Sequence, residues 1–441
     1  MRWIARAVIA LFFILFLPLV PHAQEEYKVD LGEIEKEIES KSKAPFSLNG
    51  FLEFEPKLFG ADPDTALYRL KFFDQNEGET FEEYPFSSRL EGTYTRGDLS
   101  VFFRGNAEVK SSNDGFEETT KLLEGFASYK HNANLSFDAG KKLVRWGKGY
   151  AWNPVNFIGR NRDPEDPEEA LEGFILFRAD AVRSFSGPMK TANLSAVALP
   201  VYDNFNDDFG KEDHVNFASK LYLLLWDTDI DFLYFGGASR TTRFGFDFSK
   251  NLLTNLEIHG EWAYVSNFEK GAVDSQGRFS RQEYDAINYL IGLRYLTEQE
   301  TTFILEYYHN GQGFTQEELK RFFDFADTSY ENFTRTSQDG GLQRGRTLLK
   351  SAFGRPNPGR DYIYFRASQK EPFGILFLTP AVTSILNLSD KSFVLIPEVT
   401  YSLRQNIELR GRVAGLFGSK DTEYGEKRNE YRFELRIRYF F

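Results

Sequence analysis

The feature that most constrains the fold is an alternation of apolar and charged side chains with a period of two residues. In the last segment, 431–441, every second residue is aromatic or aliphatic, and the residues between them are mostly charged. Successive side chains of a β-strand point to opposite faces, so this pattern predicts a strand with one apolar and one polar face. A soluble sandwich would bury the apolar face, whereas a membrane barrel would turn it to lipid, and the alternation alone does not choose between them.

The start of the chain reads as a secretory signal. Arg2 and Arg6 precede the apolar run 7–20, and Ala23 provides a cleavage site, so we expect residues 1–24 to be a signal peptide. No later stretch approaches the roughly 20 apolar residues that a membrane helix needs, which excludes a helical membrane protein. The chain has no cysteine, which excludes lipid attachment to cysteine, disulfides and thiol chemistry.

The carboxy terminus carries a more specific signal. The final strand ends in Tyr439-Phe440-Phe441 and resembles the assembly signal of Gram-negative outer-membrane β-barrels. The resemblance implies an all-β, transmembrane antiparallel barrel in the cell outer membrane, inserted by the barrel-assembly machinery through this strand and surrounded by outer-membrane lipid and lipopolysaccharide. The high aromatic content of 16% fits such a barrel, and the net charge of -12 argues against a nucleic-acid partner.

The same alternation, read along the chain, predicts eighteen strands. They lie near 45–58, 86–97, 98–111, 117–131, 134–146, 172–185, 190–201, 214–226, 229–238, 241–249, 254–268, 282–297, 300–310, 361–370, 374–388, 391–403, 405–418 and 428–441. We therefore expect three parts: a signal peptide (1–24), a short periplasmic helix or extension (25–44), and one barrel (45–441).

The joins between these strands test the count, because outer-membrane barrels alternate short periplasmic turns with longer outer loops. The even-numbered joins are tight, as at 96–98, 131–134, 227–229, 297–300 and 404–406. The long joins are all odd-numbered: 59–85, 147–171, 201–213, 269–281 and 311–360. Two odd joins, near Ser239 and Ser389, are short, which leaves sixteen strands as the alternative.

A barrel of this size encloses a lumen too wide for side chains to fill, so a channel is expected unless a segment closes it. Two segments could do so. Residues 25–44 carry Leu31, Ile34 and Ile38 at helical spacing. In the loop 311–360, Thr315 and Glu318 form a capping-box pattern, which predicts a helix that either folds inward as a constriction or lies on the surface.

Lumen charge is the first candidate functional feature. If the alternation holds, one set of arginines faces inward and lines the solute path: Arg89, Arg104, Arg178, Arg243, Arg294, Arg366, Arg410, Arg412, Arg432, Arg436 and Arg438. Charged rows in a pore select by sign, and on the last two strands we expect an unneutralised positive excess that favours anions. The alternative is that these arginines pair with inward carboxylates as a structural lattice.

The second candidate is the motif RWGKGYAWNPVN at 145–156, with Arg145, Trp146, Trp152, Asn153 and Pro154 as its marked positions. Its tryptophans and its Asn-Pro turn predict an interfacial aromatic and a tightly folded loop. The motif resembles one found in a broad group of proteobacterial outer-membrane barrels that is distantly similar to the alginate-export channels. Membership would imply a porin or a polysaccharide or small-solute channel.

The sequence supports an enzymatic function less well than it supports a channel. The mature chain holds only His131, His214, His259 and His309, and a lipid-acting or peptide-acting barrel enzyme would need His214 or His309 beside a carboxylate and a hydroxyl. We interpret His259, between Glu257 and Glu261, as a solvated lumen histidine. The acidic run 163–169 is expected to be a solvated outer loop, or else a divalent-cation site.

Taken together, these features predict a porin-like channel for passive diffusion of small hydrophilic solutes, either anionic or saccharide, with no cofactor, no metal and no catalytic residues. Two other classes stay open. A barrel with a blocked lumen would serve a structural or adhesive role, and a barrel enzyme would act on lipid.

Overall fold

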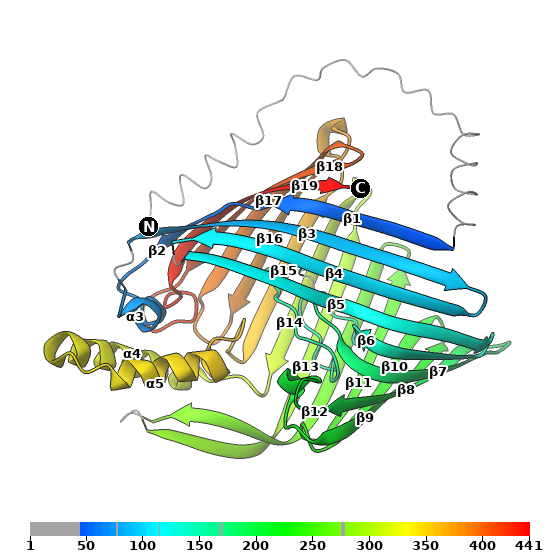
Figure 1. Ribbon diagram of the computed structural model, residues 1–441, viewed down its shortest axis with the longest axis horizontal. Coiled ribbons are helices and arrows are strands. Elements are labelled where there is room, and N and C mark those ends of the chain that lie inside the picture. The colour runs from blue at the N-terminus through cyan, green and yellow to red at the C-terminus, as the bar shows by residue number, and fades with distance from the viewer. Residues whose placement is uncertain (1–44, 76–77, 114, 167–168, 170, 275–277) are drawn as a thin grey trace.

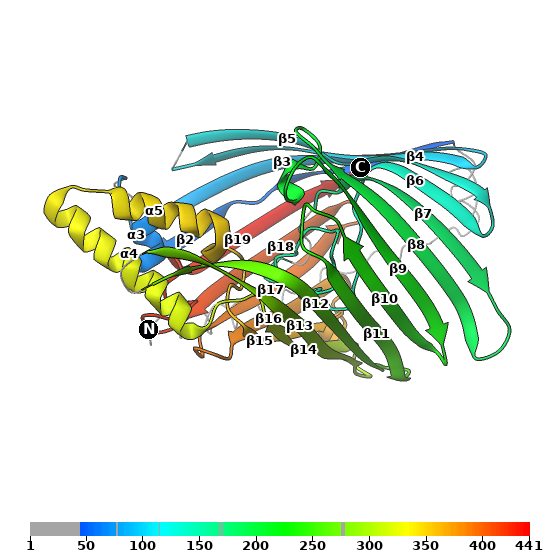
Figure 2. The same cartoon turned by 90° about the horizontal axis from the view of Figure 1, so that it is seen from below.

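The computed structural model describes residues 45–75, 78–113, 115–166, 169, 171–274 and 278–441. Over these residues the chain forms one closed antiparallel β-barrel of eighteen strands (Figures 1 and 2). Consecutive strands pair along the sequence, and the last pairs with the first. The all-β fold is thus confirmed, while the signal peptide and the segment 25–44 lie outside the described residues.

The first strand is built from two segments, β1 (Phe46–Phe54) and β2 (Lys57–Ala61), which both pair with the second and the last strands. Pro56 lies between them and cannot donate to the ladder. Two backbone hydrogen bonds of 3.1 Å, from Glu55 N to Pro85 O and from Leu435 N to Pro56 O, keep this segment bonded to both neighbouring strands. Nineteen labelled segments therefore make eighteen strands.

The remaining strands follow the predicted order closely. They are β3 (Thr80–Arg96), β4 (Leu99–Ser112), β5 (Gly115–Asn132), β6 (Leu135–Lys142), β7 (Phe174–Ser184), β8 (Met189–Val201), β9 (His214–Leu225), β10 (Thr228–Gly236), β11 (Arg243–Leu253), β12 (Leu256–Val273), β13 (Phe279–Leu296), β14 (Thr301–Asn310), β15 (Asp361–Gln369), β16 (Leu378–Asn387), β17 (Phe393–Arg404), β18 (Ile407–Phe417) and β19 (Asn429–Phe440). The short joins near Ser239 and Ser389 both connect separate strands, so eighteen is confirmed over sixteen.

Alternation sets which face of each strand lies outside. In β19, Leu435 and Ile437 are 50% and 43% exposed, whereas Arg436 between them is 3% exposed. In β13, Ile291 is exposed and Leu290 is buried. The apolar face thus forms the outer surface of the barrel and the charged face lines its interior. So large an apolar outer surface is unfavourable in water, as expected of a wall that faces lipid.

Closure of the barrel depends on the carboxy-terminal residue. Phe441 and Gly50 exchange two backbone hydrogen bonds of 3.0 Å, and Phe51 stands opposite Phe440 in the β1–β19 register. A Cβ on Gly50 would lie 2.5 Å from Arg89 O and 2.6 Å from the Phe441 ring. Close approach of three strand backbones at this point therefore requires a glycine.

The joins divide the barrel into a short-turn end and a long-loop end. The short-turn end holds tight turns such as 97–98 and 254–255, and its longest join, 370–377, contains η3 (Pro372–Gly374). The long-loop end holds the joins 62–79, 143–173, 202–213 with η1 (Asp207–Phe209), 311–360 and 418–428. The predicted 269–281 loop is shorter than expected, because β12 and β13 extend as a hairpin to Val273 and Phe279.

The helices gather at the long-loop end, beside the barrel rather than inside it (Figure 2). α4 (Gln316–Thr336) begins with the predicted capping box of Thr315 and Glu318, which is confirmed. It packs with α3 (Ala66–Phe72), α5 (Gly340–Leu348), the π-helix η2 (Leu349–Phe353) and the end of β12 in one apolar cluster. The inward placement of this helix is therefore wrong. No helix in the described part of the chain is long and apolar enough to cross a membrane.

Candidate functional site: an inward-folded loop and the charged barrel interior

The eleven arginines predicted to face inward all lie on strands, and most belong to ion pairs within the wall. Arg104 on β4, for example, contacts Glu91 on β3 and Glu124 on β5 at 2.8 Å each. Nine lie within 4.0 Å of a carboxylate: Arg104, Arg178, Arg294, Arg366, Arg410, Arg412, Arg432, Arg436 and Arg438. The lattice interpretation accounts for these contacts, and a role in the solute path stays a prediction.

The two remaining arginines have different surroundings. Arg89 lies over the Phe51 ring, 4.7 Å from its centroid, and Arg243 lies 6.0 Å from the centroid of Phe235. Neither makes an ion pair with a residue that the structure describes, and the Nε atom of each is buried without a hydrogen-bond partner. Arg243 is the first residue of β11 and therefore stands at the long-loop end.

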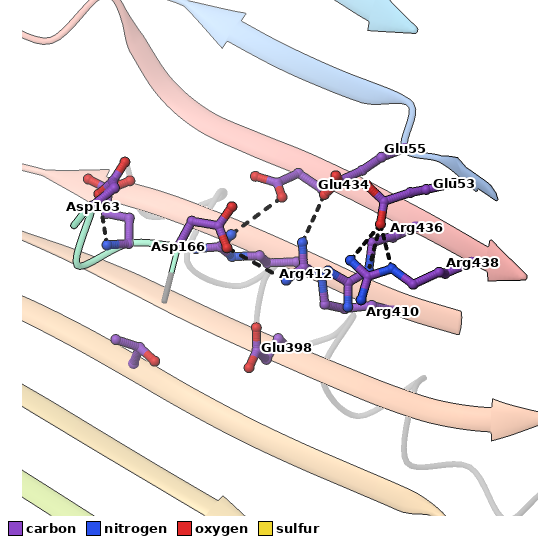
Figure 3. Close-up of polar contacts among 12 residues, drawn as sticks. Glu53, Glu55, Asp163, Asp166, Glu398, Arg410, Arg412, Glu434, Arg436 and Arg438 are labelled. Atoms are coloured by element: carbon purple, nitrogen blue, oxygen red, sulfur yellow. Dashed lines mark hydrogen bonds and ion pairs between the residues drawn. The ribbon is translucent and has the colours of Figure 1, made fainter. Parts of the chain in front are cut away.

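On the closing strands, the predicted arginine cluster does form (Figure 3). Arg410 on β18 stands opposite Arg436 on β19. The neighbouring carboxylates are Glu53 and Glu55 on β1, Glu408 on β18, Glu434 on β19, and Glu165 and Asp166 from the join 143–173. The last two were not expected here. Each of the five guanidinium groups lies within 4.0 Å of a carboxylate, so the expected unneutralised excess is not found.

The described residues of the join between β6 and β7, 143–166, 169 and 171–173, are called the inner loop below, because they fold into the barrel. Glu261 on β12 is 3% exposed and accepts hydrogen bonds from the backbone N–H groups of Lys148 and Gly149, both at 2.6 Å, and of Val155 at 3.3 Å. It also accepts from Asn153 Nδ2 at 3.1 Å. A loop away from water must satisfy its N–H groups, and this one carboxylate serves three of them.

Glu306 on β14 is a second anchor for the inner loop. It accepts from the backbone N–H groups of Tyr150 at 2.5 Å and Ala151 at 2.9 Å, and it contacts His259 Nε2 at 2.9 Å. His259 is fully buried, so its interpretation as a solvated lumen residue is wrong. The Tyr150 hydroxyl reaches Glu257, the second residue of β12, at 3.1 Å. The inner loop therefore extends through the lumen almost to the short-turn end.

Lys148 attaches the inner loop to the barrel wall at a third point, through ion pairs. Its Nζ lies 2.9 Å from Asp231 on β10 and 3.7 Å from Asp247 on β11, two buried carboxylates that stand directly opposite each other. Lys220 also contacts Asp231, at 3.4 Å. Burial alone would lower the pKa of Lys148, but the two aspartates raise it above its ordinary value. Lys148 thus stays charged and attaches the inner loop to this pair of carboxylates.

Apolar contacts attach the inner loop to both sides of the barrel. Trp146 and Val155 belong to a buried cluster with residues of β7–β12, including Phe235. Trp152 stacks on Tyr308 of β14 with the ring centroids 5.1 Å apart, in a second cluster on β13–β18. Both indoles are buried inside the barrel, so the expected interfacial position of the motif's tryptophans is wrong. The loop, whose teal trace runs inside the ring of strands in Figure 2, spans the lumen.

Part of the acidic run is not a solvated outer segment, because Asp163, Glu165 and Asp166 are partly buried. Glu169 is exposed as predicted, and residues 167–168 lie outside the described residues. Glu165 lies 3.2 Å from Lys427 Nζ and 3.6 Å from Arg432. Burial would raise the pKa of Glu165, but these two cations outweigh it and lower the pKa. Across the described residues, no group of three or more His, Cys, Asp or Glu could hold a metal ion.

At the long-loop end, the inner loop forms the floor of a cavity of about 700 Å³, called the mouth cavity below. Asn153 and Pro154 of the motif line it, whereas the motif's Arg145 is exposed nearby and does not. Five arginines line it: Arg160, Arg162, Arg240, Arg243 and Arg355. Only Arg243 was predicted, because the other four lie in loops, where no alternation assigns a direction to a side chain.

The described residues do not form the arrangement of histidine, carboxylate and hydroxyl that a lipid-acting or peptide-acting barrel enzyme would need. His309 Nδ1 contacts Asp361 at 2.8 Å, and the Tyr307 hydroxyl donates to the same carboxylate. Within the described residues, no serine or threonine hydroxyl bonds to His309, and His214 pairs with no carboxylate. The expectation that the chain is not an enzyme stays a prediction.

No protein-family model matches the chain, and no curated protein matches it. Among solved structures, a triple and a double mutant of the Rhodopseudomonas blastica porin align at 11% identity and a TM-score of 0.43, over 90% of this chain and 100% of the porin. A structure described by the asymmetric conductivity of engineered proteins aligns with the same values. At that identity and TM-score these similarities carry no argument about function, and the resemblance to the alginate-export group stays a prediction.

Proposed function

We propose that this chain is an outer-membrane, porin-like channel through which small hydrophilic solutes diffuse passively. The observation that carries the proposal is the inner loop, which is held inside a closed eighteen-stranded barrel by charged and polar anchors. An open barrel of this size would pass solutes with little discrimination. A loop fixed across the lumen narrows the path and lines it with charges. The channel then selects solutes both by their size and by their charge.

The surroundings of the barrel follow from the same proposal. The exposed apolar outer face would contact outer-membrane lipid and lipopolysaccharide, and the carboxy-terminal strand would be the segment that the barrel-assembly machinery recognises. The short-turn end would lie in the periplasm. The solutes would be anionic or saccharide, because guanidinium and amide groups supply hydrogen-bond donors along the path.

A planar-bilayer recording tests the proposal. We expect the full-length barrel to give discrete conductance steps in potassium chloride. Replacing Glu261→Gln removes the negative charge that three backbone N–H groups share, and each charge-assisted bond contributes roughly 1.5–3 kcal/mol. The inner loop should then detach from β12, and the conductance of a single channel should rise.

The matched control is Glu298→Gln, the same chemical change at an exposed position of the β13–β14 turn. It should conduct like the unaltered protein. A folded barrel that shows no conductance steps would contradict the channel. An unchanged conductance of the Glu261→Gln barrel would contradict the role of the inner loop as its constriction.

A second candidate function is favoured by one observation, the attachment of the inner loop to apolar clusters on both walls. A loop so fixed could block the lumen, leaving a barrel that serves a structural or adhesive role through its outer loops. Absence of conductance in both the unaltered barrel and Glu261→Gln, with both folded, would support this candidate instead.

A further inference from the structure

The mouth cavity differs from the rest of the barrel interior in its charge. Its five arginines face only two lining carboxylates among the described residues, Asp208 and Glu169. Asp208 is already engaged, because it pairs with Arg160. Glu169, the other lining carboxylate, is exposed and forms no ion pair with the described residues. Two carboxylates cannot offset five guanidinium groups, so the cavity wall carries an excess of positive charge. Most arginines elsewhere in the wall, by contrast, lie within 4.0 Å of a carboxylate.

The other four arginines of the cavity have no carboxylate partner among the described residues. Arg162 donates to the backbone oxygen of Tyr150 at 3.2 Å, and Arg240 donates to the backbone oxygens of Phe209 and Phe157. The side chains of Arg243 and Arg355 make no hydrogen bond or ion pair with the described part of the chain, and the Nε atom of Arg243 is buried. Backbone carbonyls satisfy some donors without neutralising any charge.

These arginines are close enough to repel one another. Burial, followed by repulsion from Arg243, lowers the pKa of Arg240 to about 9. Repulsion from Arg160 and Arg355 contributes to this lowered pKa, and Asp208 acts in the opposite direction. A cluster of like charges at the edge of a low-dielectric wall is costly in the absence of an anion. An anion that binds between them removes that cost.

Neutral donors and acceptors complete the lining. The indole Nε1 of Trp152 and the side-chain oxygen of Asn288 are both buried without a hydrogen-bond partner, and both residues line the cavity. Buried polar atoms are nearly always paired in folded proteins, so unpaired ones that line a cavity indicate a ligand or ordered water. The volume of about 700 Å³ is in the range of small-molecule sites.

We propose that the mouth cavity is a binding site for a small soluble oxyanion that carries two or more carboxylate or phosphate groups, held chiefly by Arg240, Arg243 and Arg355. Guanidinium groups bind such oxygens in a bidentate manner, and two or more charges on one solute engage several arginines together. This inference deepens the proposed function: the site lies on the path between the outer loops and the inner loop, so it would concentrate the anion before passage.

Calorimetric titration of the full-length barrel in an uncharged detergent tests the site, with citrate and inorganic phosphate as probes. We expect citrate to bind, phosphate to bind more weakly, and both affinities to fall as potassium chloride is raised. The double variant Arg243→Gln with Arg355→Gln should weaken citrate binding by about a hundredfold or more, since two charge-assisted bonds are lost and each is worth about tenfold or more in affinity. Neither of these two side chains forms a hydrogen bond with the described residues, so both substitutions leave the hydrogen bonds of the fold intact.

Two further variants make the result specific. Arg243→Lys with Arg355→Lys keeps both charges but loses the bidentate bonds, so it should bind citrate more tightly than the Gln variant and more weakly than the unaltered barrel. The matched control is Arg96→Gln with Arg404→Gln, two exposed arginines at the short-turn end, which should bind citrate as the unaltered barrel does. A shift of the folded band on heating before electrophoresis would verify that every variant is a closed barrel.

Three results would overturn the site: no citrate binding by the folded barrel, equal binding by the Arg243→Gln/Arg355→Gln variant, or binding of lipopolysaccharide phosphates with none of citrate. The last would mean that the cavity meets a lipid headgroup rather than a solute. Calorimetry needs no ion flow, so a barrel that binds citrate without conducting would contradict the channel and still support the site.

Discussion

Arg412 on β18 lies directly opposite Glu434 on β19, and both side chains face the interior almost without exposure. Glu434 contacts Arg412 at 3.5 Å and also contacts Arg432. Arg432 has a second carboxylate, Glu165. Among the described residues, Glu434 is the only carboxylate within 4.0 Å of Arg412, although Glu398 on β17 stands opposite Arg412 in the strand register. A buried charge that loses its partner strongly destabilises the fold, whereas an intact buried pair changes the free energy of unfolding little.

This asymmetry gives a prediction for stability. Glu434→Gln should destabilise the barrel by about 3–5 kcal/mol, because it leaves Arg412 buried and unpaired. Adding Arg412→Gln should restore much of the loss, since the uncompensated charge is then gone. Urea titrations of the folded barrel in detergent, followed by band shift on electrophoresis, would measure both. Equal stability of the two variants would contradict the pairing, and exposed Glu298→Gln should leave the midpoint unchanged.

Among the elements, the closing strand pair depends most on a single position. Gly50 on β1 exchanges backbone hydrogen bonds with Phe441, and its missing Cβ leaves room for the Phe441 ring and for Arg89 O. The inner loop shows a second use of glycine. Gly147 has a φ of +104°, and a Cβ there would lie 2.6 Å from a Glu261 oxygen, so the backbone can approach the carboxylate only without a side chain.

We predict that Gly50→Ala impairs closure. The added methyl group would lie 2.5 Å from Arg89 O, and overpacking of this kind costs roughly 1–3 kcal/mol. The folded fraction on refolding into lipid vesicles should fall, as measured by the heat-shifted band. The matched control is Gly411→Ala on β18, where a Cβ would meet nothing within 4 Å. Indistinguishable folding of the two variants would show that closure does not depend on this contact.

At the scale of the whole molecule, the two ends of the barrel differ in architecture: tight turns at one, loops and the helical cluster of α3–α5 at the other (Figure 1). In an outer-membrane barrel the short turns face the periplasm. The absence of cysteine makes the orientation directly measurable, since any introduced thiol is unique.

Single cysteines at the two ends should therefore label differently on intact cells. Ser337→Cys lies at the exposed end of α4, and Asp98→Cys lies in the exposed β3–β4 turn. A membrane-impermeant thiol reagent should modify Ser337→Cys only, and after lysis it should modify both. Labelling of Asp98→Cys alone on intact cells would reverse the orientation.

Sequence alone determined the barrel and its strand order. Alternation with a period of two is a local property of the backbone, so it assigned each strand and its outward face without knowledge of the neighbours. The capping box of Thr315 and Glu318 is equally local, and the helix that it begins was predicted correctly. What these patterns could not give was the position of that helix, because its apolar face could pack in the lumen or against α3 and α5.

Only the tertiary structure decided the interior. The bond from Lys148 N to Glu261 joins residues 113 positions apart, and nothing near either residue indicates the other. The same holds for the mouth cavity, where Arg160, Arg240 and Arg355 come from three separate loops. Loops have no fixed periodicity, so their side chains take direction from the partners they meet. For the inner loop those partners are buried carboxylates on the inner face of the barrel, such as Glu261 and Glu306, and this face exists as a surface only once the strands have closed.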